Sequence, residues 1–164
     1  DLAEKFPEQV SAIAPLNAIF RRTKTASRAV KQRALEIRES ARSDPEATLQ
    51  RWFGAAPKGD LKLARDECRD WLTEVNHEGY SQAYSVFANE NGPADSTLTN
   101  LKCPALFVTG SDERNSTPAM SRRLAAGVSQ GRAAIVSGAR HMMPMTHADE
   151  VGALLTGFFD EVKA

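Results

Sequence analysis

Short apolar runs alternate with longer stretches in which apolar residues recur every three or four positions along the 164-residue chain. Two of the runs, 105–108 and 133–136, contain apolar residues only, which is typical of strands buried on both faces of a parallel sheet. A third run, 10–20, is mainly apolar and is bounded by charged residues, so it suits a strand of the same kind. The alternation of such runs with helical stretches predicts an α/β fold with a parallel sheet.

The segment that follows the run at 10–20 is 21–93, and it has helical spacing throughout. A helix start is expected at Asp44-Pro45-Glu46, because aspartate is a favoured N-cap and proline is tolerated in the first turn. Farther along, Tyr80, Tyr84 and Phe87 recur at i, i+4 and i+7, which places them on one helix face. The sequence therefore predicts an all-helical insertion between two strands of the sheet.

Charge and hydropathy exclude several classes of partner. Lysine plus arginine equals aspartate plus glutamate, 21 of each, and the resulting zero net charge argues against a nucleic-acid or membrane-surface partner. No apolar run approaches the length of a membrane span, and no signal peptide is visible. A cytoplasmic location is therefore expected.

The spacing of cysteine and histidine does not indicate a metal site. Cys68 and Cys103 both lie in apolar patterns, so both are expected to be buried, reduced thiols. The stretch from His141 to His147 contains three methionines, and such soft donors could suit copper. A proline and a helix start explain this stretch better, so neither a metal nor another cofactor is expected.

Candidate chemistry follows the runs at 105–108 and 133–136. The first opens into an acidic loop with Asp112 and Glu113, and the second opens into a loop with His141. The carboxyl ends of parallel strands lie at one edge of a sheet, so these side chains are expected to meet. A histidine can act as a general base when a carboxylate fixes its tautomer, and the pattern predicts such an acid–histidine pair.

These strands and loops resemble the C-terminal third of the α/β-hydrolase fold. The resemblance rests on Cys-Pro-Ala-Leu-Phe-Val-Thr-Gly at 103–110, on Asp112 or Glu113, and on Gly138-Ala139-Arg140-His141, and it continues to Val151. In this family the triad runs along the chain in the order nucleophile, acid, histidine. The resemblance implies the C-terminal part of a parallel-sheet α/β-hydrolase fold, with core at 1–22 and 95–164 and a helical cap at 23–94.

The resemblance also implies a function. A member of this family would hydrolyse a small ester, lactone, amide or activated carbon–carbon bond through a Ser-His-Asp/Glu triad. The pattern at 1–17 resembles the helix tail and strand that follow the nucleophile, so the nucleophile is expected about two helical turns before Asp1. This chain would then supply the acid and His141 and would be inactive by itself. The alternative is a non-catalytic fragment or a binding module that reuses the fold.

The identity of the acid is open between two neighbours. The family pattern has a glycine, two further residues, then the acid, with a proline about five residues later. Gly110 and Pro118 put Glu113 at that place. The residue type favours Asp112 instead, because aspartate is the usual acid, although glutamate is chemically adequate. Spacing leads us to expect Glu113.

The helical insertion resembles the cap that shapes the substrate pocket in this family. Its aromatic residues, together with a methionine beside the histidine, are the candidate substrate-binding residues: Trp52, Tyr80, Tyr84, Phe87 and Met142. The alternative for the aromatic residues is packing between helices. Besides a small-molecule substrate, the expected partner is the N-terminal segment of the same protein as a companion chain, or a second copy joined across 10–20, because an open apolar strand edge invites pairing.

Gly127-Val128-Ser129-Gln130-Gly131 matches the nucleophile motif G-x-S-x-G by letter. That motif needs a strand before the serine and a helix after it. Here a helix is expected before Ser129 and a strand after it, which would place this serine at the opposite end of the sheet from His141. Ser129 is therefore not expected to be the nucleophile.

Overall fold

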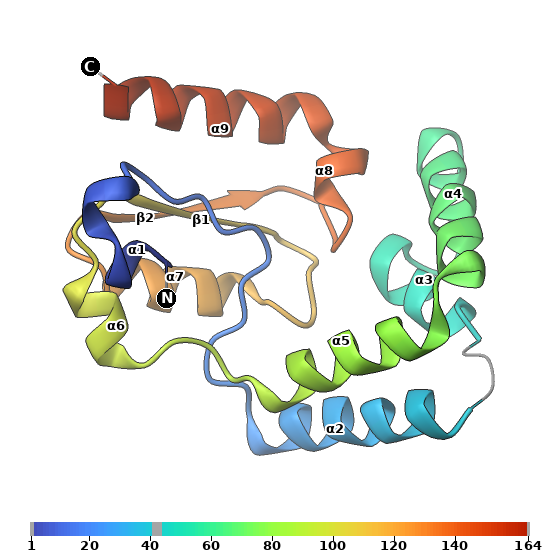
Figure 1. Cartoon of the computed structure of the whole chain (residues 1–164). Helices are drawn as coiled ribbons and strands as arrows, with labels where there is room; N and C mark the ends of the chain where they lie inside the picture. Colours follow the sequence, from blue (N-terminus) through green and yellow to red (C-terminus); the bar gives the residue numbers. More distant parts are fainter. Residues whose placement is uncertain (1, 41–43, 164) are drawn as a thin grey trace. The chain divides into compact units, whose positions relative to one another are not determined.

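The computed structural model describes residues 2–40 and 44–163 and divides the chain into two compact units (Figure 1). The core unit joins the two ends of the chain, up to Phe20 and from Gly92 onward. The helical unit spans Arg21–Asn91. Each unit has its own internal packing.

The centre of the core unit is a pair of parallel strands. β1 (Ala105–Gly110) pairs with β2 (Gly131–Val136) in a register that sets Ala105 opposite Gly131 and Gly110 opposite Val136. The helix α7 (Pro118–Ala126) connects the two strands and packs against both. Every residue of β1 is buried, as expected of an inner strand of a parallel sheet. The predicted α/β class with parallel strands is confirmed.

The run at 10–20 lies along the other side of β1, but the prediction of one continuous strand there was wrong. It makes two isolated parallel bridges to β1, from Ile13 to Ala105 and from Leu16 to Val108. Backbone hydrogen bonds support this pairing, since the amide of Leu106 donates to the carbonyl of Ile13 at 2.9 Å. The extended segment therefore adds a third line of backbone to the sheet without regular strand geometry.

Two residues interrupt this third line. Pro15 has no backbone N–H and cannot donate to the ladder, although its carbonyl accepts a hydrogen bond from the amide of Val108 at 3.0 Å. Asn17 then adopts a left-handed backbone conformation with φ of 51°, which bends the chain out of the sheet. These local features break the strand that the apolar run predicts.

Each face of the sheet carries its own apolar cluster. One cluster joins Phe107 of β1 to the helices α6 (Asp95–Asn100) and α7, through Leu98 and Leu124. The other joins Val108 of β1 to α8 (Met143–Thr146) and α9 (Ala148–Lys163). Figure 1 shows α7 and α9 on opposite sides of the two strands. The short helices α1 (Leu2–Lys5) and η1 (Pro7–Gln9) precede the extended segment.

The helical unit contains α2 (Lys24–Glu39), α3 (Glu46–Phe53), α4 (Asp60–Glu74) and α5 (His77–Asn89). The helices α2 and α5 lie side by side, and α3 packs on α4. Asp44 accepts a hydrogen bond from the amide of Glu46 at 2.9 Å and so satisfies a donor at the start of α3, but the N-cap is Pro45, one residue later than the sequence predicts. The expected all-helical character of this segment is confirmed in its described residues.

Arg22 ties the start of α2 to the end of α5. Its side chain is buried, and Nη1 donates to the carbonyl oxygens of Phe87 at 3.3 Å and Glu90 at 2.5 Å. The guanidinium carbon lies 4.3 Å from the centre of the Phe87 ring. Burial lowers the pKa of Arg22 from its ordinary value. The arginine thus donates to carbonyls that have no partner within the helix at the C-terminus of α5, where a positive charge is favourable.

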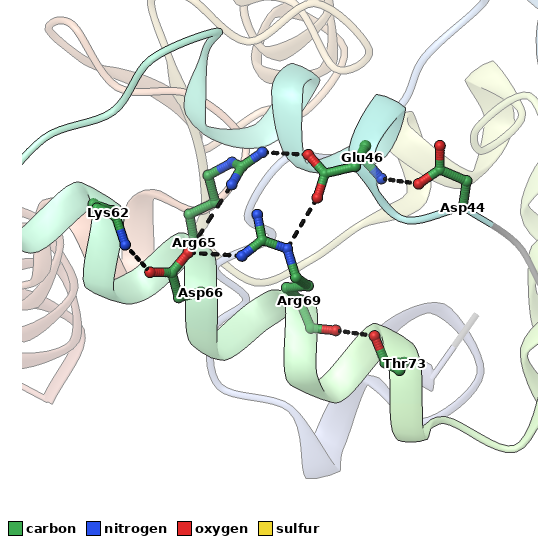
Figure 2. A network of polar contacts seen from close by, with 7 residues as sticks. All are labelled: Asp44, Glu46, Lys62, Arg65, Asp66, Arg69 and Thr73. Carbon is green, nitrogen blue, oxygen red and sulfur yellow. Dashed lines mark hydrogen bonds and ion pairs between the residues drawn. The ribbon is translucent and has the colours of Figure 1, made fainter.

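A polar network joins α3 to α4 (Figure 2). Glu46 accepts hydrogen bonds from Nη2 of Arg65 at 2.5 Å and from Nε of Arg69 at 2.9 Å. Arg69 also reaches Asp66 at 2.8 Å, and Lys62 pairs with the same aspartate. The hydrogen bond from Arg69 is the main reason why the pKa of Glu46 is lowered. Because the carboxylates are solvent-exposed, the network orients the two helices more than it stabilises them.

Within the parts of the chain that the structure describes, no helix combines the length and apolar character that a bilayer crossing requires.

Candidate active site

Two loops leave the carboxyl ends of the strands and run against each other. The acid loop, 111–117, follows β1, and the histidine loop, 137–142, follows β2. The amide of Asp112 donates to the carbonyl of Ala139 at 2.9 Å, and the amide of Gly138 donates to Oγ of Ser111 at 2.8 Å. These two hydrogen bonds hold the loops together independently of the side chains of Glu113 and His141.

Close approach of the loops depends on Gly110, the last residue of β1. A β-carbon at this position would lie 2.1 Å from the carbonyl oxygen of Ala139. No side chain fits there without moving the backbone of the histidine loop. The glycine thus permits the two strand ends to converge.

The loops bring an acid and a histidine into direct contact. Nδ1 of His141 lies 2.9 Å from Oε2 of Glu113. Glu113 is buried with 4% of its surface exposed, whereas His141 is partly exposed. The other carboxylate oxygen, Oε1, accepts from the backbone amides of Asn115 at 2.6 Å and Ser116 at 3.3 Å. The carboxylate is therefore hydrogen-bonded through both oxygens and fixed in orientation.

This environment favours the ionised form of Glu113. Burial alone would raise the pKa of Glu113, but the hydrogen bond and charge of His141 and the two backbone amides lower it by more. An ionised carboxylate only accepts hydrogen bonds, so the proton in the contact belongs to Nδ1 of His141. In the neutral imidazole, Nε2 is then the basic nitrogen, which is the tautomer that a general base requires.

The structure separates the two candidate acids. Asp112 is exposed, and its Oδ1 accepts a hydrogen bond from Oγ of its neighbour Ser111 at 3.0 Å. Glu113 is the one of the pair that faces His141, in line with the spacing argument and not with the argument from residue type. The catalytic role of either carboxylate stays a prediction.

The predicted substrate-binding residues lie in both units. Tyr80, Tyr84 and Phe87 form a row on α5, with ring centres 6.0 Å and 5.6 Å apart along the row. Trp52 lies on α3. Met142 follows His141 directly, at the start of α8 in the core unit. Their part in substrate binding stays a prediction.

The remaining candidates lie away from the acid–histidine pair or make local contacts. Ser129 lies in the turn between α7 and β2, before the amino end of β2, while His141 follows its carboxyl end. Nδ1 of His147 lies 2.9 Å from Oγ1 of its neighbour Thr146, and His77 is the first residue of α5. Among the described residues, no group of three or more histidine, cysteine or acidic side chains could hold a metal ion. Cys68 and Cys103 are both buried.

Sequence reasoning missed two polar residues behind the pair. Nδ2 of Asn17 donates to the carbonyl oxygen of His141 at 2.7 Å, and Oγ1 of Thr109 lies 3.1 Å from Oδ1 of Asn17. Asn17 and His141 are 124 residues apart, so no local pattern connects them. An asparagine and a threonine within or beside apolar runs were the available signal, since buried polar groups need partners.

Comparison with curated proteins finds a hydrolase that is similar to this chain. No family model matches the chain. It is 34% identical over 154 residues to (E)-2-((N-methylformamido)methylene)succinate hydrolase from Acinetobacter baylyi, a match that covers 94% of this chain and 57% of the relative. The chain therefore spans little more than half the length of this curated relative, and it corresponds to its C-terminal part.

Solved structures show the same fold. The enol-lactonase from Burkholderia xenovorans superposes with a TM-score of 0.82 at 23% identity, covering 97% of this chain and 60% of that protein. A thermophilic esterase from Thermogutta terrifontis superposes with a TM-score of 0.79 at 18% identity, covering 99% of this chain and 60% of that protein. The chain has the α/β-hydrolase fold, with the architecture of the C-terminal part of that fold.

Proposed function

We propose that the chain provides the acid and the histidine of a hydrolase that cleaves small acyl compounds. The observation that carries this proposal is the 2.9 Å contact between Nδ1 of His141 and the buried carboxylate of Glu113. Both residues follow the carboxyl ends of parallel strands, where α/β proteins gather reactive groups. A paired histidine with its second nitrogen basic is the arrangement that activates a hydroxyl nucleophile.

The relatives support a substrate class and not a single compound. The curated relative is named for hydrolysis of a methylformamido-methylene succinate, and the solved structures are named an enol-lactonase and an esterase. Amides, lactones and esters share an acyl carbon that a nucleophile attacks. We therefore place a small ester, lactone or amide ahead of an activated carbon–carbon bond.

In the proposed reaction, Nε2 of His141 removes the proton of a serine hydroxyl as its oxygen attacks the acyl carbon. The resulting imidazolium is stabilised by Glu113, and it returns the proton to the leaving group as the tetrahedral intermediate collapses. The same histidine then activates a water molecule that hydrolyses the acyl-enzyme. The serine and the oxyanion donors would come from the N-terminal part of the fold. In the curated relative, this part lies outside the region that matches the present chain.

The helical unit is proposed to act as the cap, with Trp52, Tyr80, Tyr84 and Phe87 as substrate contacts and Met142 beside the histidine. Among the described residues, the bridges of the extended segment up to Asn17 run to β1, and an edge without a partner strand invites backbone pairing. We propose that the N-terminal part of the hydrolase fold occupies this edge, as a companion segment or chain, and that a second copy is the alternative. Light scattering after size-exclusion chromatography distinguishes these states, and a cooperatively unfolding monomer of 17.9 kDa would contradict both.

The test uses the polypeptide that carries the whole fold. We expect it to turn over p-nitrophenyl acetate or dihydrocoumarin and to form a stoichiometric adduct with a fluorophosphonate. His141→Ala should abolish both, with losses on the order of 10⁴ to 10⁶ in turnover, whereas His147→Ala should retain both.

Two outcomes would contradict the proposal. An adduct mapped to Ser129 would show that the nucleophile is Ser129 and not a serine from the N-terminal part of the fold. The absence of both adduct and turnover in the folded protein would favour a binding module that reuses the fold.

A further inference from the structure

A side chain from outside both catalytic loops holds the backbone of the catalytic histidine. Nδ2 of Asn17 donates a 2.7 Å hydrogen bond to the carbonyl oxygen of His141. Asn17 stands at the end of the extended segment, and its own amide donates to the carbonyl of Val108 in β1 at 2.9 Å. The asparagine is therefore anchored to the central strand while its side chain reaches the histidine loop.

The orientation of this amide is settled by its contact with the carbonyl of His141. The carbonyl of His141 accepts only, so the nitrogen of the Asn17 side chain faces it and the oxygen faces Thr109. Oγ1 of Thr109 lies 3.1 Å from Oδ1 of Asn17 and 2.7 Å from the carbonyl oxygen of Ser116. Thr109 is fully buried in β1, and its single hydroxyl proton is shared between these two acceptors, with the shorter contact to the carbonyl of Ser116.

These contacts close into a ring. From Ser116 the backbone amide donates to Oε1 of Glu113 at 3.3 Å, and Oε2 of the same carboxylate meets Nδ1 of His141 at 2.9 Å. The ring thus passes through Asn17, Thr109, Ser116, Glu113 and His141 and returns to Asn17. It connects the extended segment, β1 with the loop that follows it, and the loop that follows β2.

The backbone of Asn17 is part of the same arrangement. Its φ of 51° is a left-handed conformation that most side chains disfavour and that asparagine tolerates better than they do. A glycine would adopt this backbone conformation but has no side-chain amide to donate to the carbonyl of His141. An aspartate would keep the shape but present an oxygen to the carbonyl of His141. Asparagine is thus the residue that meets both the backbone and the hydrogen-bond requirements.

We propose that Asn17 is a positioning residue for the acid–histidine pair. By fixing the carbonyl of His141 from one side and Thr109 from the other, it sets the distance and angle between the imidazole and Glu113. Its catalytic significance rests on the proposed hydrolase function, but its effect on the geometry of the pair does not.

The geometric effect is measured in this chain without any substrate. Nuclear magnetic resonance of ¹⁵N-histidine-labelled protein reports the tautomer of His141 and the exchange of its Nδ1 proton with water. We expect a slowly exchanging Nδ1 proton in the unaltered chain. Asn17→Gly and Asn17→Asp should each accelerate exchange about tenfold or more, as expected for the loss of one hydrogen bond, and should shift the imidazole nitrogens toward mixed tautomers.

Arg21→Gly is the matched control, because Arg21 has the same positive φ of 51° and lies outside the ring. It changes the backbone preference in the same way and should leave the His141 signals unchanged. Asn17→Asp keeps the side-chain shape, so it serves if Asn17→Gly fails to fold. Unchanged His141 signals in both Asn17 variants would overturn the proposal.

A second readout links the ring to catalysis in the polypeptide with the whole fold. Asn17→Gly should lower kcat about tenfold and leave KM nearly unchanged, because the Asn17 side chain is engaged by the carbonyl of His141 and by Thr109. Altered exchange with no change in kcat would refute the catalytic significance while leaving the positioning role intact. Altered exchange in a protein with no hydrolase activity at all would refute the proposed function instead.

Discussion

Gly110 lies so close to Ala139 that a β-carbon on Gly110 would be 2.1 Å from the carbonyl oxygen of Ala139. That carbonyl is also the acceptor for the amide of Asp112, at 2.9 Å. The end of β1 and the histidine loop are thus in backbone contact, and the contact sets the span that Glu113 and His141 must bridge. Any side chain at position 110 would increase this span.

Gly110→Ala should therefore destabilise the protein by about 1–3 kcal/mol, as overpacking of a close backbone contact does. Urea unfolding measures this difference. Gly152→Ala is the matched control on α9, where an added β-carbon meets nothing within 4 Å. There the better helix propensity of alanine should stabilise the protein by about 0.5–1 kcal/mol. Equal effects of the two variants would contradict the argument from close approach.

Glu113→Gln should lower kcat by about 10⁴ in the polypeptide with the whole fold, because an amide can hold the imidazole in the wrong tautomer and cannot stabilise its charged form. Asp112→Asn should have an effect of less than about tenfold, since its carboxylate faces Ser111 and solvent. Steady-state kinetics with p-nitrophenyl acetate compare the two. A larger loss for Asp112→Asn would make that residue the orienting acid.

The lowered pKa of Glu113 predicts a pH dependence of stability. Below its ordinary value of 4.5, the unfolded chain takes up the proton more readily than the folded chain does. The stabilisation from the ionised carboxylate is therefore fully present above about pH 5 and is lost as the pH falls through the folded-state pKa.

The free energy of unfolding, measured from pH 7 to pH 3, should fall less steeply toward acid in Glu113→Gln than in the unaltered chain. The buried position of Glu113 and its two backbone donors are the physical reason. Asp112→Asn is again the control and should leave the slope nearly unchanged. Parallel curves for the unaltered chain and Glu113→Gln would disprove the stabilising role of the ionised form.

Arg22→Ala should destabilise the protein by about 1–3 kcal/mol, because it removes hydrogen bonds from a buried arginine to two carbonyls at the end of α5 and the contact with Phe87. Arg22→Lys should recover only part of this, since an ammonium does not reproduce the planar geometry. Arg28→Ala, on the exposed side of α2, should change stability by less than about 0.5 kcal/mol. Urea unfolding with helicity as the signal tests all three, and equal losses at Arg22 and Arg28 would contradict this account.

The sequence by itself determined most of the elements and the resemblance to the α/β-hydrolase fold. Apolar runs without polar interruption identified the two strands, and the 3.6-residue period identified the helices, because both signals depend on near neighbours in the chain. The placement of His141 after an apolar strand also followed from local pattern, although only Val136 of β2 is buried. These features depend on which residues are adjacent, and adjacency is what a sequence records.

The tertiary structure decided the rest. Asp112 and Glu113 are neighbours of similar chemistry, and only the turn of the acid loop, in which the amides of Asn115 and Ser116 bind one oxygen of Glu113, aims that carboxylate at His141. The break in the predicted strand at 10–20 likewise depends on the ladder position that Pro15 occupies beside β1.

The ring through Asn17 and Thr109 is the clearest case of a feature that no local pattern contains. Its members come from residues 17, 109, 113, 116 and 141, which the parallel sheet brings together at the carboxyl ends of its strands. Hydrogen bonds act over about 3 Å in space and are indifferent to separation along the chain. The chain order therefore predicted that a histidine and an acid would meet, and only the fold decided what holds them in place.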